Sequence, residues 1–334
     1  MDVLIDFLST FLSQLQKPTL AFLIGGVVIA ALGSNLTIPD PIYRFIVFML
    51  LITIGLEAGI EIREADLLSM IPPALIAVTI GSGAVVVGAF VLTRLPKLKA
   101  DDGYATAGLF GAVSASTLAA AMVVLNEENI PFEAWVPALY PFMDLPALLA
   151  AIVLAGVARQ KRSGDGAKAD IKAIIVDSLR GSAISALLLG MVLGGLTRPD
   201  GVVETFYDPL FRGLLSILML ILGMEAWARM SELAKVAHWY AIYGVVTPLV
   251  LGLAAFGLGY VAHVLTGFSP GGVVLLAVMA GSSSDISGPP TLRAGIPGAN
   301  PSTYIGSSTA VGTPVAIAIG IPLYVALAQL VFDL

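Results

Sequence analysis

The chain has 334 residues, of which 57% are hydrophobic and only 12% are charged. A soluble domain is nearer half apolar and a quarter charged, so this composition indicates a membrane protein with several spans and excludes a disordered chain. There are 17 Lys and Arg against 23 Asp and Glu, for a net charge of -6, which argues against nucleic-acid binding. With no cysteine and two histidines, disulfides, thiol chemistry and Cys- or His-rich metal centres are excluded.

The first segment, residues 1–16, is expected to be an amphipathic helix lying in the membrane interface. Its leucines and phenylalanines recur at spacings of three and four, the period of a helix with one apolar face. Asp2 and Asp6 stand where a secretory signal peptide would carry basic residues, so a signal peptide is not expected. The alternative is an extension of the first span, and Pro18 argues against it because it separates the two.

Ten apolar runs follow, each near the roughly 20 residues that a spanning helix needs. The longest hydrophilic stretch, Arg159 to Lys172, separates the first five runs from the last five. The sequence therefore predicts an all-α polytopic membrane protein with a five-helix repeat at residues 17–158, a linker at 159–176 and a second repeat at 177–334. The expected spans are about 19–33, 41–59, 67–92, 104–125, 134–158, 177–196, 209–226, 237–265, 271–290 and 302–331.

The two halves carry the same landmarks at one offset of 168 residues, the difference between 209 and 41. The matching pairs are Pro41 with Pro209, Arg44 with Arg212, Gly55 with Gly223, Glu57 with Glu225 and Glu64 with Glu232. Because five spans is an odd number, the second repeat must enter the membrane from the opposite side. A 5+5 inverted repeat of this kind is the architecture of many secondary transporters, with the substrate site near the midplane where the repeats meet.

Positive charge predicts the orientation of the chain. If the ten spans are correct, 13 of the 17 Lys and Arg lie on the side of the central linker. The four on the other side are Lys17, Arg63, Arg198 and Arg212. Since Lys and Arg favour the cytoplasmic side, we expect the linker in the cytoplasm and both termini outside.

Spans four and nine carry Gly- and Ser-rich interruptions at corresponding positions, which is the pattern expected of a transporter site. Gly111-Ala-Val-Ser114 in span four lies opposite Gly281-Ser-Ser-Ser284 in span nine. Pro289 and Pro290 cannot donate backbone hydrogen bonds, so they must interrupt span nine. Both prolines suit the first turn of a new half-helix, and Ser287 or Gly288 is expected to cap it.

The residues at these interruptions suit small ions. The N-terminus of a half-helix carries partial positive charge and free N–H donors, which attract anions. Hydroxyl groups nearby could complete the contacts, although such serines also commonly hydrogen-bond between helices. Asp285 and unwound carbonyl groups supply hard oxygen ligands for a cation such as Na⁺. Asp144 is the other acidic residue deep within a span, and in its Pro-flanked segment it could instead cap a broken helix.

Two membrane aspartates also raise the alternative of an intramembrane aspartyl protease, in which two carboxylates share a proton. The Gly-x-Gly-Asp signature of such an enzyme is absent, since three serines precede Asp285. The chain also lacks a P-loop, so it is not expected to hydrolyse ATP by that route. No enzymatic activity is expected.

Five stretches closely resemble the SbtA family, the sodium-dependent bicarbonate transporters of cyanobacterial plasma membranes. They are residues 108–117, 140–146, 207–219, 282–297 and 305–314. The resemblance implies a Na⁺/HCO₃⁻ symporter of the CO₂-concentrating mechanism that needs no cofactor and uses Na⁺ as the coupling ion. It also implies a fold like that of bile-acid/sodium symporters, a homotrimer, and inhibition by the PII-like protein SbtB at the cytoplasmic face.

The resemblance also implies roles for individual residues. Bicarbonate would lie against Ser114, Ala115, Ser116, Thr117, Ser282, Ser283, Ser284 and Gly288. The candidate Na⁺ ligands are Asp144, Asp285, Ser307, Ser308, Thr309 and Thr313. The residues alone predict a secondary transporter of small ions, and bicarbonate depends on the resemblance. The alternative is a Na⁺/H⁺ antiporter of related fold, which would bind no anion.

Overall fold

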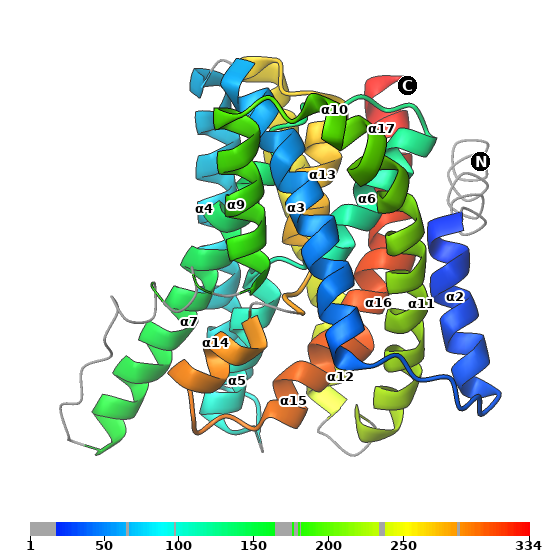
Figure 1. Cartoon of the computed structure of the whole chain (residues 1–334). Helices are drawn as coiled ribbons and strands as arrows, with labels where there is room; N and C mark the ends of the chain where they lie inside the picture. The colour runs from blue at the N-terminus through cyan, green and yellow to red at the C-terminus, as the bar shows by residue number, and fades with distance from the viewer. Residues whose placement is uncertain are drawn as a thin grey trace, which may run out of the picture.

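In the computed structural model, the described residues are 18–64, 67–96, 98–163, 176, 180, 182–233, 238–285 and 288–334. Within these ranges the chain forms helices joined by short turns and contains no β-strand, so the all-α prediction is confirmed (Figure 1). The expected interfacial helix at residues 1–16 and most of the expected linker lie outside the described residues.

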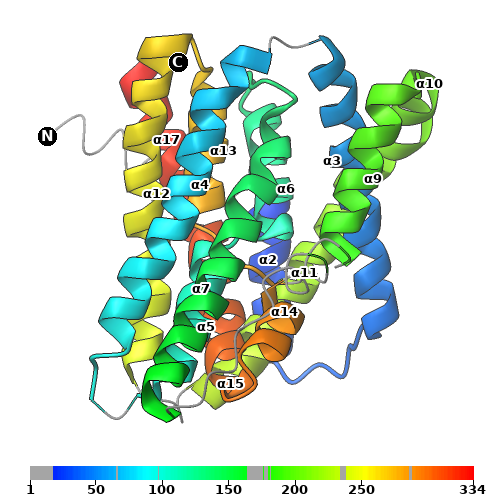
Figure 2. The ribbon, with the colours of Figure 1, turned by 90° about the vertical axis from the view of Figure 1, so that its left-hand side faces the viewer.

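The helices of the first half run along one common axis, up and down the bundle (Figures 1 and 2). They are α2 (Pro18–Ala31), α3 (Asp40–Glu64), α4 (Leu67–Leu92), α5 (Ala100–Gly111), α6 (Ala115–Glu127), the short 3-10 helix η1 (Val136–Leu139) and α7 (Tyr140–Ser163). α5 lies in the lower half of the bundle and α6 in the upper half, so the fourth expected span is broken in the middle (Figure 1).

The second half of the chain also consists of long helices, and one of its spans is broken near the centre of the bundle. It comprises α9 (Ser182–Leu196), α10 (Asp200–Val202), η2 (Val203–Tyr207), α11 (Asp208–Leu233), α12 (His238–Thr266), α13 (Pro270–Ala280) and α14 (Gly288–Gly295). A last continuous stretch follows, in which π-helical turns alternate with α-helix: α15 (Pro301–Ile305), η3 (Gly306–Gly312), α16 (Thr313–Val315), η4 (Ala316–Gly320) and α17 (Ile321–Phe332). Its end, the C-terminus, lies at the opposite end of the bundle from the end of α7 (Figure 1).

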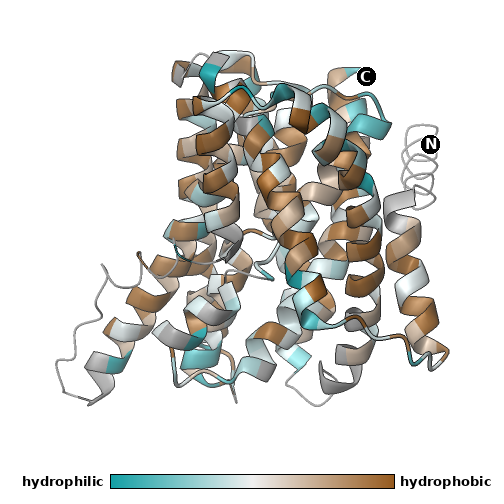
Figure 3. Cartoon of the chain, viewed as in Figure 1, coloured by the Kyte–Doolittle hydropathy of each residue, from teal (hydrophilic) through white to brown (hydrophobic). Residues whose placement is uncertain are grey.

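Six helical stretches among the described residues are long and apolar enough to cross a membrane, and three shorter apolar helices accompany them. Hydrophilic residues gather at the two ends of the bundle, while its sides are mostly apolar (Figure 3). Large apolar side chains such as Val87 on α4 and Val250 on α12 are exposed, as expected for helices that face lipid. The polytopic membrane protein is confirmed, and the count of ten spans stays a prediction.

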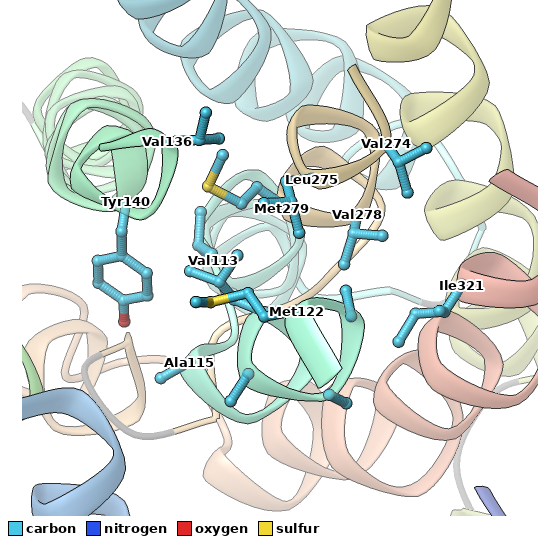
Figure 4. Close-up of a cluster of buried hydrophobic side chains, with 14 of the residues drawn as sticks. Val113, Ala115, Met122, Val136, Tyr140, Val274, Leu275, Val278, Met279 and Ile321 are labelled. Atoms are coloured by element: carbon cyan, nitrogen blue, oxygen red, sulfur yellow. The ribbon is translucent and has the colours of Figure 1, made fainter. Parts of the chain in front are cut away.

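Of the six long apolar stretches among the described residues, the broken fourth span is the most buried. The apolar window of Ala100–Glu127 is 100% buried inside the protein, compared with 28% for His238–Thr266. Irregular backbone at membrane depth is tolerated only where protein or a water-filled cavity surrounds it. Apolar side chains from α6, α13 and η1, including Met122, Val136 and Leu275, pack around this region (Figure 4). The interruption is therefore surrounded by protein.

Glycine contacts join α2 to α11. Gly26 on α2 lies directly against Gly223 on α11, and a Cβ added to Gly26 would stand 2.2 Å from the carbonyl oxygen of Leu220. A Cβ added to Gly223 would stand 2.1 Å from the carbonyl oxygen of Leu23. Neither helix can carry a side chain here, so the two backbones touch.

A second pair, α3 and α9, crosses in the same manner. Gly55 on α3 lies against Gly190 on α9, and a Cβ added to Gly190 would stand 2.5 Å from the carbonyl oxygen of Ile52. Gly194, one turn further along α9, approaches the carbonyl oxygen of Leu56 equally closely. The Gly-x-x-x-Gly pattern at 190 and 194 is thus a helix contact, and its partner is α3.

Candidate functional site

The break between α5 and α6 is capped by two side chains. Ser114 is the N-cap of α6, and its Oγ accepts a hydrogen bond from the N–H of Thr117 at 3.1 Å. The carboxylate of Asp144, on α7, is fully buried and its Oδ1 accepts from the N–H of Val113 at 3.0 Å. Asp144 therefore has the capping role that the sequence left open, because it satisfies a backbone donor that the interrupted helix leaves without a carbonyl partner.

At the break between α13 and α14, a serine of the unwound segment serves the start of α14. Both prolines lie in the first turn of α14, as predicted, and Gly288 is its first helical residue. The oxygen that accepts from the Gly288 N–H, at 2.8 Å, is the Oγ of Ser284. Pro289 and Pro290 have no N–H, so the usual cap donors are missing and a serine from the unwound segment serves the donor that remains. Gly288 as cap was wrong, and Ser287 lies outside the described residues.

Hydrogen bonds join the two breaks to each other. The N–H of Ser114 donates to the Oγ of Ser282 at 2.9 Å. In the other direction, the N–H of Ser284 donates to the carbonyl oxygen of Leu109 at 2.9 Å. The Oγ of Ser116 donates to the Oδ2 of Asp285 at 2.6 Å, a short bond of the charge-assisted kind. The two interruptions, 170 residues apart (Gly111 to Gly281), therefore meet at one place.

The serines predicted to bind an anion have protein partners in this conformation. Ser114 Oγ lies 2.9 Å from Ser116 Oγ and accepts from Thr117 Oγ1 at 2.9 Å. Ser282 Oγ donates to the carbonyl oxygen of Met279 at 2.7 Å. These four side chains are at most 1% exposed. An ion that enters must exchange its own hydrogen bonds for those that now join the hydroxyls.

The serines and threonines of the last span approach the same place from η3 and α16. Ser308 Oγ donates to Ser283 Oγ at 2.8 Å, so this residue reaches the second break. Ser307 Oγ donates instead to the carbonyl oxygen of Tyr304 in its own helix, at 3.0 Å. Thr309 is 7% exposed, and Thr313 Oγ1 is buried with no hydrogen-bond partner among the described residues. Ser308 and Thr313 are therefore the best placed of the four to accept a ligand.

The electrostatics of the site are set by two helix N-termini and one carboxylate. Asp285 bonds to the first turn of α6 through Ser116 and stands three residues before the start of α14. Helix N-termini carry about half a positive charge, so both stabilise this carboxylate. Asp285 supplies the negative charge that a cation needs, and the two helix ends can attract an anion once that charge is balanced.

Sequence reasoning missed two carboxylates that hold the ends of the broken spans. Glu133 Oε1 accepts from the N–H of Ser269, the N-cap of α13, at 2.9 Å. Asp102, near the start of α5, accepts from the N–H of Asn300 at 2.7 Å. A Ser-Pro or Asn-Pro pair before a helix marks each loop that donates the N–H, but nothing in the sequence indicates which carboxylate accepts from it.

Comparison with known proteins gives one result for nearly the whole chain. The family model described as the Na⁺-dependent bicarbonate transporter superfamily matches residues 18–329. The match includes α5, α6, α13 and α14, and hence both breaks. A comparison with curated proteins found no match.

Proposed function

The chain belongs to the Na⁺-dependent bicarbonate transporter superfamily, and from this premise we propose that it is a symporter that imports HCO₃⁻ with Na⁺ through the plasma membrane. The observation that carries the proposal is the meeting of two broken helices, with the N-termini of α6 and α14 and the carboxylate of Asp285 at one place. Such a crossing offers an anion and a cation adjacent sites.

Bicarbonate binds between the first turns of α6 and α14 in this proposal. The backbone of Ala115 and the hydroxyls of Ser114, Ser116 and Thr117 line one side. Ser282, Ser283, Ser284 and Gly288 line the other. A singly charged anion gains from both helix dipoles and from N–H and O–H donors, which is the chemistry of anion sites at helix N-termini. The hydrogen bonds now formed among these serines are released as the ion enters.

Sodium binds on the other side of Asp285, with Ser308 and Thr313 as hydroxyl ligands. Coupling follows from charge. Before Na⁺ binds, the negative charge of Asp285 lies at the two helix N-termini and repels bicarbonate from them. A bound Na⁺ neutralises this carboxylate, and the positive helix ends are then available to bicarbonate. The anion is therefore bound well only after the cation.

A 5+5 inverted repeat with alternating access completes the proposal. The offset of 168 residues between landmarks supports it, and so does the pairing of helices. In the repeat, α2 corresponds to α9 and α3 to α11, so the contacts of α2 with α11 and of α3 with α9 are equivalent. The two broken spans then move as one unit against these four helices and expose the crossing to each side in turn.

Uptake in reconstituted vesicles tests the function. We expect labelled bicarbonate to accumulate under an inward Na⁺ gradient and not when choline replaces Na⁺. A Na⁺/H⁺ antiporter would instead move protons in the absence of bicarbonate, and a protease would move neither. Proton flux without bicarbonate uptake would therefore contradict the proposal.

The linker is predicted to be cytoplasmic and the termini to be outside. The chain contains no cysteine, so single cysteines can be introduced without background. We expect an impermeant thiol reagent, added to intact cells, to label Ser9→Cys and to leave Ser163→Cys unlabelled. Labelling of both positions after permeabilisation is the control for reactivity. Labelling of Ser163→Cys in intact cells would reverse the topology.

A homotrimer regulated by a PII-like protein at the cytoplasmic face is also proposed. The candidate contacts are Arg94, Lys97, Lys99, Arg229 and Arg293. Of these, Arg94, Lys99 and Arg293 are exposed, and α5 and α14 lie at the end of the bundle where α7 ends (Figure 1). We expect the solubilised protein to capture a PII-like protein in a pull-down, and reversal of these charges to abolish capture. Unchanged capture would exclude these residues as the contact.

A further inference from the structure

A second polar cluster is buried where α5 begins, and we propose that it is a second Na⁺ site. The cluster consists of Asp102, Thr106, Tyr240 and Tyr304, which are 6%, 0%, 2% and 0% exposed. Asp102 precedes the end of α5 at Gly111 by nine residues, or about 13 Å along the helix. It is therefore separate from the crossing of the two breaks.

Three hydroxyl groups in the cluster lack a protein partner. The oxygens of Thr106, Tyr240 and Tyr304 are buried, and none has a hydrogen-bond partner among the described residues. Buried polar atoms in native proteins are nearly always hydrogen-bonded, because an unpaired one loses its water without compensation. One such atom needs an explanation, and three of them around one carboxylate indicate a bound group that is not part of the chain.

The four side chains converge from three helices. Thr106 lies one turn after Asp102 on the same face of α5, so the two are neighbours. Tyr240, at the start of α12, and Tyr304, on α15, lie near enough to Asp102 for its charge to act on both hydroxyls, and the charge of Arg293 acts on Tyr304 as well. Both tyrosine rings belong to one apolar cluster with Ala105 of α5, which keeps the surroundings dry.

The chemistry of the cluster favours a monovalent cation. Its one carboxylate excludes an anion, and its hydroxyls are hard neutral oxygen ligands. One buried negative charge balances one Na⁺, whereas a divalent ion would leave an unpaired positive charge in a dry region. The neighbouring Asp101 does not change this count, because it pairs with Arg159 at 3.5 Å. Two cations act on the cluster, Lys99 on Asp102 and Arg293 on Tyr304, and both side chains are exposed to solvent rather than buried in the cluster.

The position of the cluster gives the cation a role. Asp102 Oδ1 accepts from the N–H of Asn300, in the loop between α14 and α15. A Na⁺ held by Asp102 and Tyr304 would therefore fasten the start of one broken span to the end of the other. This deepens the Na⁺ coupling of the proposed function, with one cation at the crossing and another at this end of the same pair of spans.

Binding of Na⁺ alone to the purified full-length protein tests the proposal without transport. We expect equilibrium binding of radioactive Na⁺, at constant ionic strength in choline, to give one ion fewer per chain in Asp102→Asn than in the wild type. The asparagine oxygen can still accept from Asn300, so a purely structural role of Asp102 would leave binding unchanged. Tyr304→Phe and Tyr240→Phe are each expected to lower the affinity for that Na⁺ by roughly 2- to 12-fold, the effect of one neutral hydrogen bond.

Two comparisons separate the possible outcomes. Removing an unpartnered hydroxyl should not lower the melting temperature in choline, so the phenylalanine variants should fold. Tyr324→Phe is the matched control, because the Tyr324 hydroxyl donates to the carbonyl oxygen of Pro248 at 2.9 Å. This variant should leave Na⁺ binding unchanged.

The Asp285→Asn variant should still bind one Na⁺, and adding Asp102→Asn to it should abolish that binding. If Asp285→Asn alone abolishes all binding while Asp102→Asn matches the wild type, the cluster holds only water and the proposal fails. A wild type that binds no Na⁺ would overturn the proposed function as well.

Discussion

Asp285→Asn is expected to raise the Na⁺ concentration for half-maximal bicarbonate uptake by roughly 10- to 150-fold. Asparagine has the size of aspartate, so the packing of the break is kept while the charge that balances a desolvated cation is lost. A charge-assisted contact contributes about 1.5–3 kcal/mol, and 1.4 kcal/mol corresponds to a factor of ten. Uptake measured against Na⁺ concentration in vesicles gives the value directly.

Two serines serve as matched comparisons for Asp285. Ser116→Ala removes the hydroxyl that donates to Asp285 at 2.6 Å but keeps the carboxylate charge, so its effect on Na⁺ dependence should be smaller. Ser114→Ala removes a neutral group worth about 0.5–1.5 kcal/mol and should act mainly on the apparent affinity for bicarbonate. If Asp285→Asn keeps the wild-type Na⁺ curve, Asp285 is not a ligand, and Asp144 becomes the next candidate.

The voltage dependence of the same uptake reports how many cations move. One Na⁺ with one HCO₃⁻ carries no net charge, so the membrane potential would not change accumulation. Each additional Na⁺ would contribute about 2.3 kcal/mol per 100 mV. If the crossing and the cluster around Asp102 both load and release their ions in each cycle, uptake should increase with an inside-negative potential. A cation that stays fixed at Asp102 would stabilise the protein without this dependence.

The sequence predicted the positions of the breaks because proline and glycine act locally. The breaks fall at Gly111 and at Gly281, within the quoted motifs, and Pro289 and Pro290 lie in a first helical turn as expected. The helix starts mostly lie within a few residues of the expected ones, but α3, α7 and α11 continue five to seven residues beyond the expected ends, because polar residues extend a helix past its apolar span. These features depend on a few neighbouring residues, so one sequence contains the information.

The hydrogen bonds between residues far apart in the sequence could not be predicted in this way. Nothing local indicates that Ser284, rather than its neighbours, serves the Gly288 N–H, or that Glu133 reaches Ser269. The predicted ligands Ser114 and Ser116 were identified by type, yet the sequence could not reveal that they hydrogen-bond to each other. Such pairings depend on how whole helices cross, and the offset between the repeats supplies only the correspondence of segments.

The glycine contact between α2 and α11 supports a stability prediction with an adjacent control. Gly26→Ala would place a Cβ 2.2 Å from the Leu220 carbonyl oxygen, and a backbone atom cannot rotate away as a side chain can. The helices must separate, which is an overpacking effect of about 3 kcal/mol. Gly25→Ala meets nothing within 4 Å on the same helix. It should therefore be neutral or slightly stabilising, because alanine favours helix over glycine by about 1 kcal/mol.

The two variants should differ by about 3–4 kcal/mol, so thermal unfolding of the solubilised protein is expected to show Gly26→Ala melting roughly 6–16 °C below Gly25→Ala, at about 2–4 °C for each kcal/mol in a large domain. The equivalent contact between α3 and α9 should behave alike, since a Cβ at Gly55 would stand 2.3 Å from the carbonyl oxygen of Leu187. Gly55→Ala should thus lower the melting temperature, and Gly213→Ala, whose Cβ meets nothing within 4 Å, should not. Equal melting of Gly26→Ala and Gly25→Ala would mean that α2 and α11 are not in backbone contact. If Gly26→Ala lowers the melting temperature and Gly55→Ala does not, the two helix pairs are not equivalent. That result would remove one support for the inverted repeat.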